Sequence, residues 1–447
     1  MDALAGRTVL VLGLGMSGRS AARFCAERGA AVTAADERAA DALGDLGELT
    51  GRVELVVGRP FPDPAGFDLV VPSPGVPRER WADRAREALG DVELAFRHLH
   101  VPVVAVTGTN GKSTTTRLVE AMLLASGLRA RAAGNVGAPA LGLVGEPLDV
   151  AVLEVSSFQL ESASRLRPRV AAVLNVTDDH LDRHRSFAAY LEAKARLLAN
   201  QTPEDHAVLN ADDPVVRGMA HRTRAHVRYF RATGAVADGA WWDAECLVLS
   251  TPEAVRRIPV ERFGLVGRHN RENAAAALLA AAAVGADPAR AARALTDFRA
   301  LPHRAEIVAR VGGVTWIDDS KATNVGAALR ALESFGGPLV WIAGGRAKGA
   351  DLRPLADAAT KLRAALVLGE AGPALAELLR GRTRVECVPD LDAAVRRAAS
   401  LAAPGDIVLL APACSSLDQF RNAEERGERF RAAVAALARR SEPRCNA

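Results

Sequence analysis

The residues best suited to chemistry form a loop of glycine, threonine and lysine that follows an apolar run. In VVAVTGTNGKSTTT, a predicted strand leads through this loop into a predicted helix. Backbone N–H groups in such a loop can surround phosphate oxygens, Lys112 can reach the terminal phosphates, and a Ser113 or Thr114 hydroxyl can hold Mg²⁺. The spacing TGTNGKS differs from GxxxxGKS but supplies the same groups. The sequence therefore predicts binding of NTP phosphates by Gly108, Thr109, Asn110, Gly111, Lys112, Ser113 and Thr114.

Carboxylates and a histidine follow two further apolar runs. Glu154 ends the predicted strand in AVLEVSSFQL, where a bare carboxylate is costly to desolvate unless a partner such as a metal ion is near. The run VLNVTDDHLDRH places Asn175, Asp178, Asp179 and His180 after another predicted strand. Ligands of open α/β sheets bind at such strand ends. We therefore predict that Glu154 and His180 belong to the site of the phosphate loop.

Lysine is scarce in this chain, which makes each lysine informative. Of 57 basic residues only five are lysines, namely Lys112, Lys194, Lys321, Lys348 and Lys361. These lysines are candidates for roles that a guanidinium cannot fill, such as a compact phosphate contact or an amine that loses its proton. Lys194, on the amphipathic helix predicted for YLEAKARLL, is either a functional amine of this kind or a solvated lysine on the helix surface.

A second glycine motif lies near the amino terminus. The predicted strand at residues 8–12 leads into Gly13, Gly15 and Gly18 of GLGMSG, and Asp36 ends the next strand. This arrangement lets backbone amides approach a diphosphate while the carboxylate accepts hydrogen bonds from a nucleoside. The same glycines would also permit tight packing of a helix on a strand. The motif alone leaves a nicotinamide cofactor, another nucleotide and simple packing open.

Composition excludes several classes of protein. The 447 residues are 49% apolar and 25% charged, enough for two to four globular domains. The net charge of +4 comes from scattered arginines, and aromatic residues make up only 4%, so we expect no nucleic-acid partner. Five scattered cysteines without a CxxC pair argue against disulfides or structural zinc. The amino terminus is unlike a signal peptide and the longest apolar stretch, at 274–286, is short, so we expect a cytoplasmic protein without membrane insertion.

Short apolar or β-branched runs alternate with helical patterns along the chain. TVLVLG precedes SGRSAARFCAERG, VVAVTG precedes KSTTTRLVEAMLLASG, and LVWIAGG precedes LRPLADAATKLRAA at residues 352–365. The alternation predicts an α/β fold of parallel sheets covered by helices. Boundaries near residues 97 and 300 give three α/β domains, at 1–97, 98–300 and 301–447. Shorter mixed runs at 225–262 predict a small β addition.

Taken in order, the motifs of this chain resemble those of the Mur ligases. They are TGTNGKST, LEVSSFQL, NVTDDHLDRH, YLEAKARLL, GRHNRENAAAA, LPHR, DDSKATN, GGRAKG and PACSSLDQF, and the resemblance covers about residues 8–431. It implies a Rossmann-like amino-terminal domain for a UDP-linked substrate, a central P-loop-type ATP-binding domain with a mostly parallel sheet, and a Rossmann-like carboxy-terminal domain for an amino acid. DDSKATN and LPHR are similar to the members that add D-glutamate to UDP-N-acetylmuramoyl-L-alanine. The implied reaction consumes ATP, passes through an acyl phosphate and serves cytoplasmic peptidoglycan precursor synthesis, with a monomeric enzyme.

The resemblance also implies roles for individual residues. The UDP-linked substrate would contact Leu14, Met16, Ser17, Asp36 and Glu37 around uridine, and Ser73, Gly75, Asn135 and Gly137 along the diphosphate. ATP would contact the phosphate loop together with Asn270, Asn273, Arg304 and Asp319, and D-glutamate would contact Thr323, Lys348, Ser416 and Leu417. Two Mg²⁺ ions would be held by Ser113, Glu154, His180 and Lys194, the last as a carbamate. Lys112, His180 and Lys194 would be the catalytic residues.

Three positions depart from the expected pattern. Asp318 stands where asparagine is common, Ala411 where serine is common, and Ala423 where better-known members have phenylalanine near the glutamate pocket. None of the three removes a phosphate or metal group, but Ala423 changes the expected pocket wall.

Other functions fit the motifs less well. An NAD-dependent oxidoreductase would explain GLGMSG but would leave TGTNGKST and DDSKATN unexplained. A non-catalytic nucleotide-binding homologue would be expected to lack one of Lys112, Glu154, His180 or Lys194, and all four are present. Another Mur ligase or a folylpolyglutamate-type ligase stays an alternative that substrate tests would separate.

Overall fold

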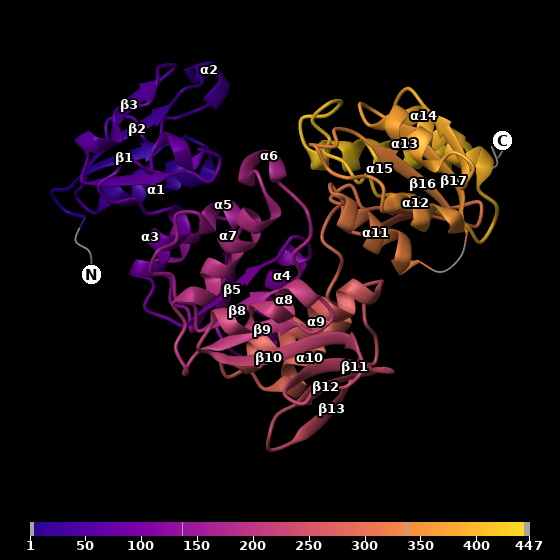
Figure 1. Ribbon diagram of the computed structural model, residues 1–447, viewed down its shortest axis with the longest axis horizontal. Helices are drawn as coiled ribbons and strands as arrows, with labels where there is room; N and C mark the ends of the chain where they lie inside the picture. Colours follow the sequence, from indigo (N-terminus) through magenta and orange to yellow (C-terminus); the bar gives the residue numbers. More distant parts are fainter. Residues whose placement is uncertain (1–3, 136, 336–337, 442–447) are drawn as a thin grey trace, which may run out of the picture. The chain divides into compact units, whose positions relative to one another are not determined.

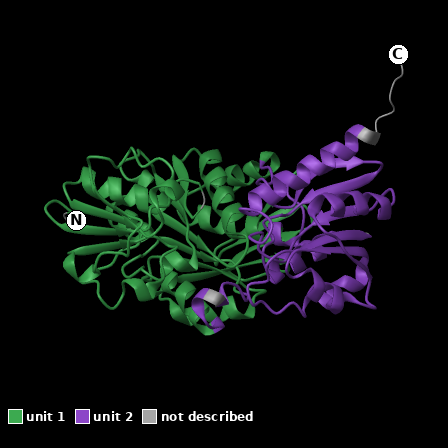
Figure 2. Cartoon of the chain, turned by 90° about the horizontal axis from the view of Figure 1, so that it is seen from above, with its two compact units in different colours: residues 1–176, 188–262, 271–297 green, residues 177–187, 263–270, 298–447 purple. Residues whose placement is uncertain are grey.

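The computed structural model describes residues 4–135, 137–335 and 338–441. The strands within these ranges form three sheets (Figure 1), and the predicted α/β class is confirmed. Contacts divide the chain into two compact units, which are coloured in Figure 2. Unit 1 comprises residues 1–176, 188–262 and 271–297, and unit 2 comprises residues 177–187, 263–270 and 298–447.

The three sheets occupy separate parts of the sequence. They lie within residues 8–72, 103–259 and 306–410, so the expected domain limits near residues 97 and 300 fall between sheets. No helix in the described part of the chain is both long and apolar enough to cross a membrane. Cys25, Cys246, Cys387 and Cys414 are free thiols, and Cys445 lies outside the described residues.

The amino-terminal sheet is small and parallel throughout. Its order is β3-β2-β1-β4, with β1 (Thr8–Leu12), β2 (Ala31–Asp36), β3 (Glu54–Val57) and β4 (Leu69–Pro72). Helix α1 (Met16–Glu27) follows β1 through the glycine motif. β1 and β4 are buried along almost their full length. Their sequences are therefore continuous apolar runs and do not alternate between apolar and polar residues.

Two glycines of GLGMSG are needed for packing. A Cβ on Gly18 would lie 1.7 Å from the Gly13 carbonyl oxygen and 2.7 Å from Ser73 Oγ. Gly13 has a φ of 84°, in the left-handed region that favours glycine. A Cβ on Gly15 would meet nothing within 4 Å. Gly13 and Gly18 therefore let the helix approach the strand, while Gly15 leaves open space at the helix start.

The central sheet contains nine strands, in the order β13-β12-β11-β10-β9-β8-β5-β7-β6. Its first strands are β5 (Val103–Thr107), β6 (Ala130–Gly134), β7 (Val150–Glu154), β8 (Val170–Val173) and β9 (His206–Asn210). The associated helices include α3 (Asp91–His98), α4 (Lys112–Ala125), α5 (Ser157–Leu160), α7 (Phe187–Ala199), α8 (Pro214–Gly218), α9 (Arg268–Ala282) and α10 (Pro288–Asp297). The strand β5 is fully buried between β7 and β8 and parallel to both. The loop after β5 therefore emerges beside the ends of these two strands.

The predicted β addition is confirmed at one edge of the central sheet. It consists of β10 (His226–Thr233), β11 (Gly239–Asp243), β12 (Cys246–Ser250) and β13 (Val255–Pro259). β10 pairs in parallel with β9 and β11, whereas β12 pairs antiparallel with both of its neighbours. The addition thus changes the sheet from parallel to antiparallel at its outer edge.

The carboxy-terminal sheet is covered by helices on both faces. Its order is β14-β15-β19-β16-β17-β18, with β14 (Glu306–Val311), β15 (Val314–Asp318), β16 (Leu339–Gly344), β17 (Leu362–Leu368), β18 (Arg384–Cys387) and β19 (Ile407–Leu410). One core contains Trp341 and Leu375, and the other contains Trp316, Val395 and Phe430. The helices are α11 (Val325–Ser334), α12 (Leu355–Ala358), α13 (Gly372–Leu379), α14 (Leu391–Leu401) and α15 (Ala423–Ser441). Only β14 runs antiparallel to its neighbour.

The prediction of a helix over residues 352–365 is wrong for its last part. α12 covers only Leu355–Ala358, a 3-10 turn follows at Ala359–Lys361, and Leu362 begins β17. The sequence LRAALVL is buried at all but one position, so it lacks the alternation of a half-buried strand. Alanine-rich buried strands cannot be separated from helices by periodicity.

Gly18→Ala tests the packing of α1. Because the new Cβ would overlap the Gly13 carbonyl oxygen, we expect a loss of about 3 kcal/mol in stability. Gly15→Ala is the matched control and should change stability by less than about 0.5 kcal/mol. Thermal unfolding followed by circular dichroism measures both, and equal stability of the two variants would contradict the packing role.

Candidate active site

The phosphate loop adopts the strand, loop and helix that its sequence predicts. β5 ends at Thr107, and Gly111 precedes α4 with a φ of 86°. A Cβ on Gly111 would lie 2.5 Å from Asn273 Oδ1, so a larger residue would displace this neighbour. Ser113 and Thr114 are buried in the first turn of α4, and the N–H groups at a helix N-terminus attract anions.

Two lysine ammonium groups meet at one carbonyl oxygen of this loop. Lys112 Nζ donates to the carbonyl oxygens of Gly108 at 2.9 Å and of Thr109 at 3.0 Å. Lys194 Nζ, from α7, donates to the same Gly108 oxygen at 2.9 Å. Lys194 is only 1% exposed and lies 4.6 Å from the centroid of the Tyr190 ring. The interpretation of Lys194 as a solvated surface lysine is therefore wrong, and the paired cations favour an anionic ligand.

Two further residues hold the loop in place. The Asn175 side chain accepts from the Asn110 N–H at 2.8 Å and donates to the Asn110 carbonyl oxygen at 3.0 Å. The Asn175 carbonyl oxygen accepts from the Thr109 N–H at 2.8 Å. Tyr190 Oη lies 3.1 Å from Thr109 Oγ1, within hydrogen-bond distance. The sequence placed Asn175 near the site but did not single out Tyr190, one turn before Lys194 on α7.

Glu154 lies at the end of β7, beside Val106 of β5. It is 1% exposed, and its Oε1 accepts from Asn135 Nδ2 at 2.7 Å. Its Oε2 is buried and has no hydrogen-bond partner among the described residues. A buried carboxylate oxygen without a partner is costly, and a divalent cation would satisfy it. The buried, unsatisfied carboxylate oxygen of Glu154 therefore fits a Mg²⁺ ligand.

A cavity of about 600 Å³ lies between the amino-terminal sheet and the segment after β6. Of the nine residues expected to contact the UDP part of a substrate, seven line it, namely Met16, Ser17, Asp36, Glu37, Ser73, Gly75 and Asn135. Leu14 lines an adjacent cavity of about 580 Å³. Gly137 lines neither, and its φ of 70° and its closeness to Arg117 suggest a backbone role. The cavity is large enough for a nucleotide.

Asp36 is fixed at the wall of this cavity. Its carboxylate accepts from the Leu14 N–H at 2.7 Å and from two nitrogens of the Arg38 side chain at 2.8 and 3.0 Å. The Arg38 guanidinium is the main reason that the pKa of Asp36 falls to about 2. Arg38 and Arg80 also line the cavity, and Arg80 pairs with Glu37. The sequence did not mark either arginine as a residue of this cavity, because arginine is common throughout the chain.

The residues expected to bind the amino acid lie on three loops of unit 2. These loops follow β15, β16 and β19, which are neighbours in the sheet, and they carry Thr323, Lys348, Ser416 and Leu417. Backbone hydrogen bonds of 2.9 Å join Arg346 to Ser415 in both directions and Ala413 to Ala322. Ser416 is 3% exposed, whereas the Leu417 side chain is 58% exposed.

A buried arginine that the sequence analysis missed links two of these loops. Arg426 donates to Ser320 Oγ at 3.0 Å, to the Ser320 carbonyl oxygen at 2.9 Å and to the Cys414 carbonyl oxygen at 3.2 Å. Burial lowers its pKa to about 10. Ser320 Oγ in turn donates to the Ala423 carbonyl oxygen at 2.7 Å. The backbone of Ala423, where phenylalanine was expected, thus anchors the loop after β15.

Lys348 has an anionic partner within unit 2. Its Nζ lies 3.4 Å from Asp179 Oδ1, and Asn324 Nδ2 donates to Asp179 Oδ2 at 3.0 Å. Lys348 has a φ of 53°, so its backbone is in the left-handed region. His180 follows Asp179 and is the N-cap residue of α6 (Leu181–His184). The ammonium of Lys348 therefore already binds a carboxylate in this structure.

Arg304 and Asp319 lie on neighbouring loops of unit 2. The Ala305 N–H donates to Asp319 Oδ1 at 3.1 Å, which fixes the Asp319 side chain beside Arg304. Burial raises the pKa of Asp319 to about 7, although the charge of Arg304 opposes this shift. The carboxyl group of Asp319 therefore changes charge near neutral pH.

The remaining candidate ATP and metal residues belong to different units. Asn270 and Asn273 are both buried in α9, and Asn270 Nδ2 donates to the Val266 carbonyl oxygen at 2.7 Å. Asn273 belongs to unit 1 with the phosphate loop, and Asn270 belongs to unit 2. His180 also belongs to unit 2, whereas Ser113, Glu154 and Lys194 belong to unit 1. The structure thus brings together the phosphate loop, Glu154, Lys194 and Asn273 in one unit.

This fold and site define a P-loop-type α/β protein that has a separate cavity for a second ligand. Three family models match the chain. They are "Mur ligase MurD-like, N-terminal domain" at residues 7–89, "Mur ligase middle domain" at 106–281 and "Mur ligase, glutamate ligase domain" at 303–414. The chain belongs to the Mur ligase family.

Curated relatives match over nearly the full length. The UDP-N-acetylmuramoylalanine--D-glutamate ligase of Geobacter metallireducens is 45% identical over 97% of this chain and 98% of its own. The ligase of the same name from Anaeromyxobacter dehalogenans is 46% identical over 96% of this chain and 97% of its own. Among solved structures, the MurF ligase from Thermotoga maritima in complex with ADP has a TM-score of 0.62 at 19% identity, covering 98% of this chain and all of that chain. This structural likeness bears on the fold alone.

Asn175→Ala tests the support of the phosphate loop. Because Asn175 is buried and bonds both backbone groups of Asn110, we expect a stability loss of about 2 kcal/mol and weaker ADP binding. Asn200→Ala also removes two side-chain hydrogen bonds, to Ser164 and Leu166, and is the control. Thermal unfolding and calorimetric titration with ADP measure both effects. If Asn200→Ala weakened ADP binding as much as Asn175→Ala, the specific role of Asn175 would be disproved.

Proposed function

We propose that this protein joins D-glutamate to UDP-N-acetylmuramoyl-L-alanine with the conversion of ATP to ADP and phosphate. The observation that carries the proposal is the likeness, at 41–46% identity over nearly the whole chain, to ligases named for this reaction. The phosphate loop with its two lysines and the nucleotide-sized cavity support it. Such a reaction supplies peptidoglycan precursors. We place it in the cytoplasm, with a monomer as the active form.

The reaction would begin with phosphoryl transfer. An oxygen of the substrate carboxylate attacks the γ-phosphorus of ATP, the bond to the ADP oxygen breaks, and an acyl phosphate forms. Positioning and charge neutralisation account for most catalysis in such transfers. The helix start at Lys112 and the Lys112 ammonium group would neutralise charge on the phosphates. Asn270 and Asn273 would contact adenine, Arg304 a phosphate, and Asp319 the ribose.

The second step would form the amide. The amine nitrogen of D-glutamate attacks the acyl carbon, a tetrahedral intermediate forms, and phosphate leaves while the amine loses a proton. Thr323, Lys348, Ser416 and Leu417 would bind D-glutamate. Lys348 suits a substrate carboxylate because it already pairs with one, that of Asp179.

Mur ligases use ATP and Mg²⁺, and the described residues fit the metal. Ser113 and Glu154 would hold one ion, which would neutralise charge on the phosphates. His180 and Lys194 would hold a second ion, with Lys194 as a carbamate. In that modification the neutral amine of Lys194 bonds to the carbon of CO₂, and one amine proton leaves to solvent.

Phosphate release tests the function directly. With ATP, Mg²⁺ and UDP-N-acetylmuramoyl-L-alanine, we expect release that depends on D-glutamate and not on L-glutamate, L-alanine or diaminopimelate. Dependence on another amino acid would keep the ligase mechanism but overturn the choice of substrate. No release with any amino acid would overturn the proposed function and favour a non-catalytic role.

Lys194→Arg tests the carbamate. Arginine keeps the positive charge but cannot take up CO₂, so we expect turnover to fall by about 100-fold or more. Carbon NMR with labelled bicarbonate should show a carbamate signal in the parent protein that is absent from the variant. Lys361→Arg changes an exposed lysine and should leave both unchanged. A Lys194→Arg enzyme with normal turnover would exclude the carbamate role.

A further inference from the structure

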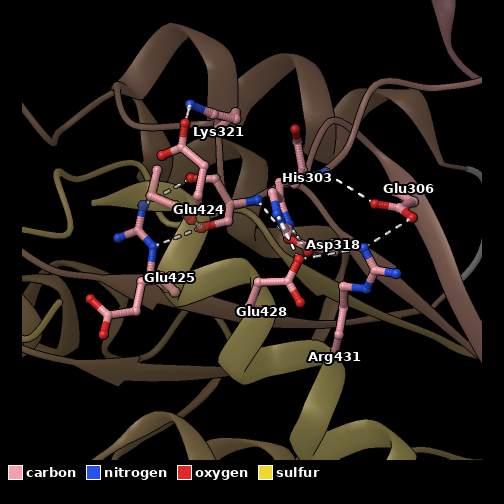
Figure 3. A network of polar contacts seen from close by, with 12 residues as sticks. His303, Glu306, Asp318, Lys321, Glu424, Glu425, Glu428 and Arg431 are labelled. Carbon is pink, nitrogen blue, oxygen red and sulfur yellow. Dashed lines mark hydrogen bonds and ion pairs between the residues drawn. The ribbon is translucent and has the colours of Figure 1, made fainter. Parts of the chain in front are cut away.

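A buried histidine in unit 2 lies between two carboxylates (Figure 3). His303 is 3% exposed, its Nδ1 lies 2.7 Å from Asp318 Oδ2, and its Nε2 lies 3.4 Å from Glu428 Oε1. Asp318 is fully buried, and its other oxygen accepts from the Ser320 N–H at 2.9 Å. Burial raises the pKa of Asp318 while the hydrogen bond to His303 opposes this shift, so the pair holds a proton between Nδ1 and Oδ2.

The backbone around His303 is held in an unfavourable conformation. His303 has a φ of 62° and Ala305 a φ of 49°, so both residues next to Arg304 lie in the left-handed region. Residues with a Cβ occupy this region only when their surroundings compensate for the strain. A relaxed backbone at either position would turn the Arg304 side chain in another direction.

Three contacts compensate for this strain and join the loop of Arg304 to the loop of Asp319. They are the His303 to Asp318 hydrogen bond, the bond of 3.1 Å from the Lys321 N–H to the His303 carbonyl oxygen, and the bond from the Ala305 N–H to Asp319. Arg304 directly follows His303, and Asp319 directly follows Asp318. The histidine pair therefore fixes the distance between two residues that would contact the nucleotide.

Helix α15 supports this pair from one side. A Cβ on Gly427 would come 2.1 Å from His303 Nδ1, so only glycine lets the ring lie against the helix. Arg431, one turn after Glu428, lies 3.5 Å from Glu306 Oε1, and Glu306 Oε2 accepts from the His303 N–H at 3.1 Å. Figure 3 shows these side chains converging on His303 from α15 and from β14.

We propose that Asp318 and Gly427 are positioning residues that hold His303, and through it Arg304 and Asp319, in the arrangement that binds nucleotide. The inference rests on the proposed function only in assigning a nucleotide to Arg304 and Asp319. It adds two residues that do not contact the nucleotide themselves.

Asp318→Ala and Gly427→Ala test the proposal in two different ways. The first removes the acceptor of His303 Nδ1–H, and the second pushes the ring away, so each should weaken ADP binding about tenfold. Affinity for UDP, measured in the same calorimetric titrations, should stay within about twofold, because the UDP-sized cavity is built from unit 1. Glu425→Ala changes a carboxylate on the same helix that bonds Arg421 instead, and is the control.

Asp318→Asn is the conservative variant. Its amide oxygen can accept from the Ser320 N–H while its amide N–H donates to the other tautomer of His303, whose Nε2–H then faces Glu428. We therefore expect ADP binding within about threefold of the parent protein.

The outcomes separate the proposal from its alternatives. Normal ADP binding by folded Asp318→Ala and Gly427→Ala would overturn it, as would an equal loss of UDP binding, which indicates general damage. If Asp318→Asn were as weak as Asp318→Ala, the negative charge rather than the position of the ring would matter, and the proposal would fail. If Asp318→Ala does not fold, Gly427→Ala and Asp318→Asn decide. Normal ADP binding by the parent protein without D-glutamate-dependent phosphate release would disprove the proposed function but leave this inference standing.

Discussion

The Gly108 carbonyl oxygen accepts hydrogen bonds from the ammonium groups of both Lys112 and Lys194, and much of the central domain serves this arrangement. Two ammonium groups that share one oxygen repel each other, and only Lys194 is fully buried, so the surrounding structure must hold both in position. Asn175 and Tyr190 provide this support by fixing the loop backbone and side chains. In the unmodified protein, negative charge beside the two ammonium groups would relieve this repulsion.

In the carboxy-terminal domain, hydrogen bonds to the backbone hold the loops that carry the candidate residues. Its candidate side chains lie on loops after β15, β16 and β19, and such loops are mobile unless they are joined. Paired bonds between Arg346 and Ser415, and the three bonds of Arg426, join these loops to one another. Lys348 can therefore sit in a left-handed conformation beside Asp179 without support from a ligand. Loops that are joined in this way would lose little entropy on binding the proposed amino acid.

The amino-terminal glycine motif both packs a helix on a strand and lines two cavities. Glycine is needed at positions 13 and 18 because α1 closely approaches the turn that follows β1. Gly15 needs no packing explanation, and it lines both neighbouring cavities together with Met16. Two glycines of the motif are thus needed for packing, and the third lines the cavities. For this reason the motif alone could not distinguish a cofactor site from tight packing.

The α/β class, the phosphate loop and the strand-end position of Glu154 could be predicted from the sequence, because they depend on local pattern. The scarcity of lysine likewise marked the lysines as candidate functional residues. The helix predicted over residues 352–365 is wrong from Leu362 onward, because a buried alanine-rich strand and a helix have similar composition. The sequence also did not mark Tyr190, Arg38 or Arg426, whose neighbours lie far away in the chain. The burial of Lys194 against the phosphate loop and the hydrogen bond between His303 and Asp318 emerge only in the folded chain. Such contacts join residues 15 to 86 positions apart, and no local pattern encodes a hydrogen bond between segments that only the folded sheet brings together.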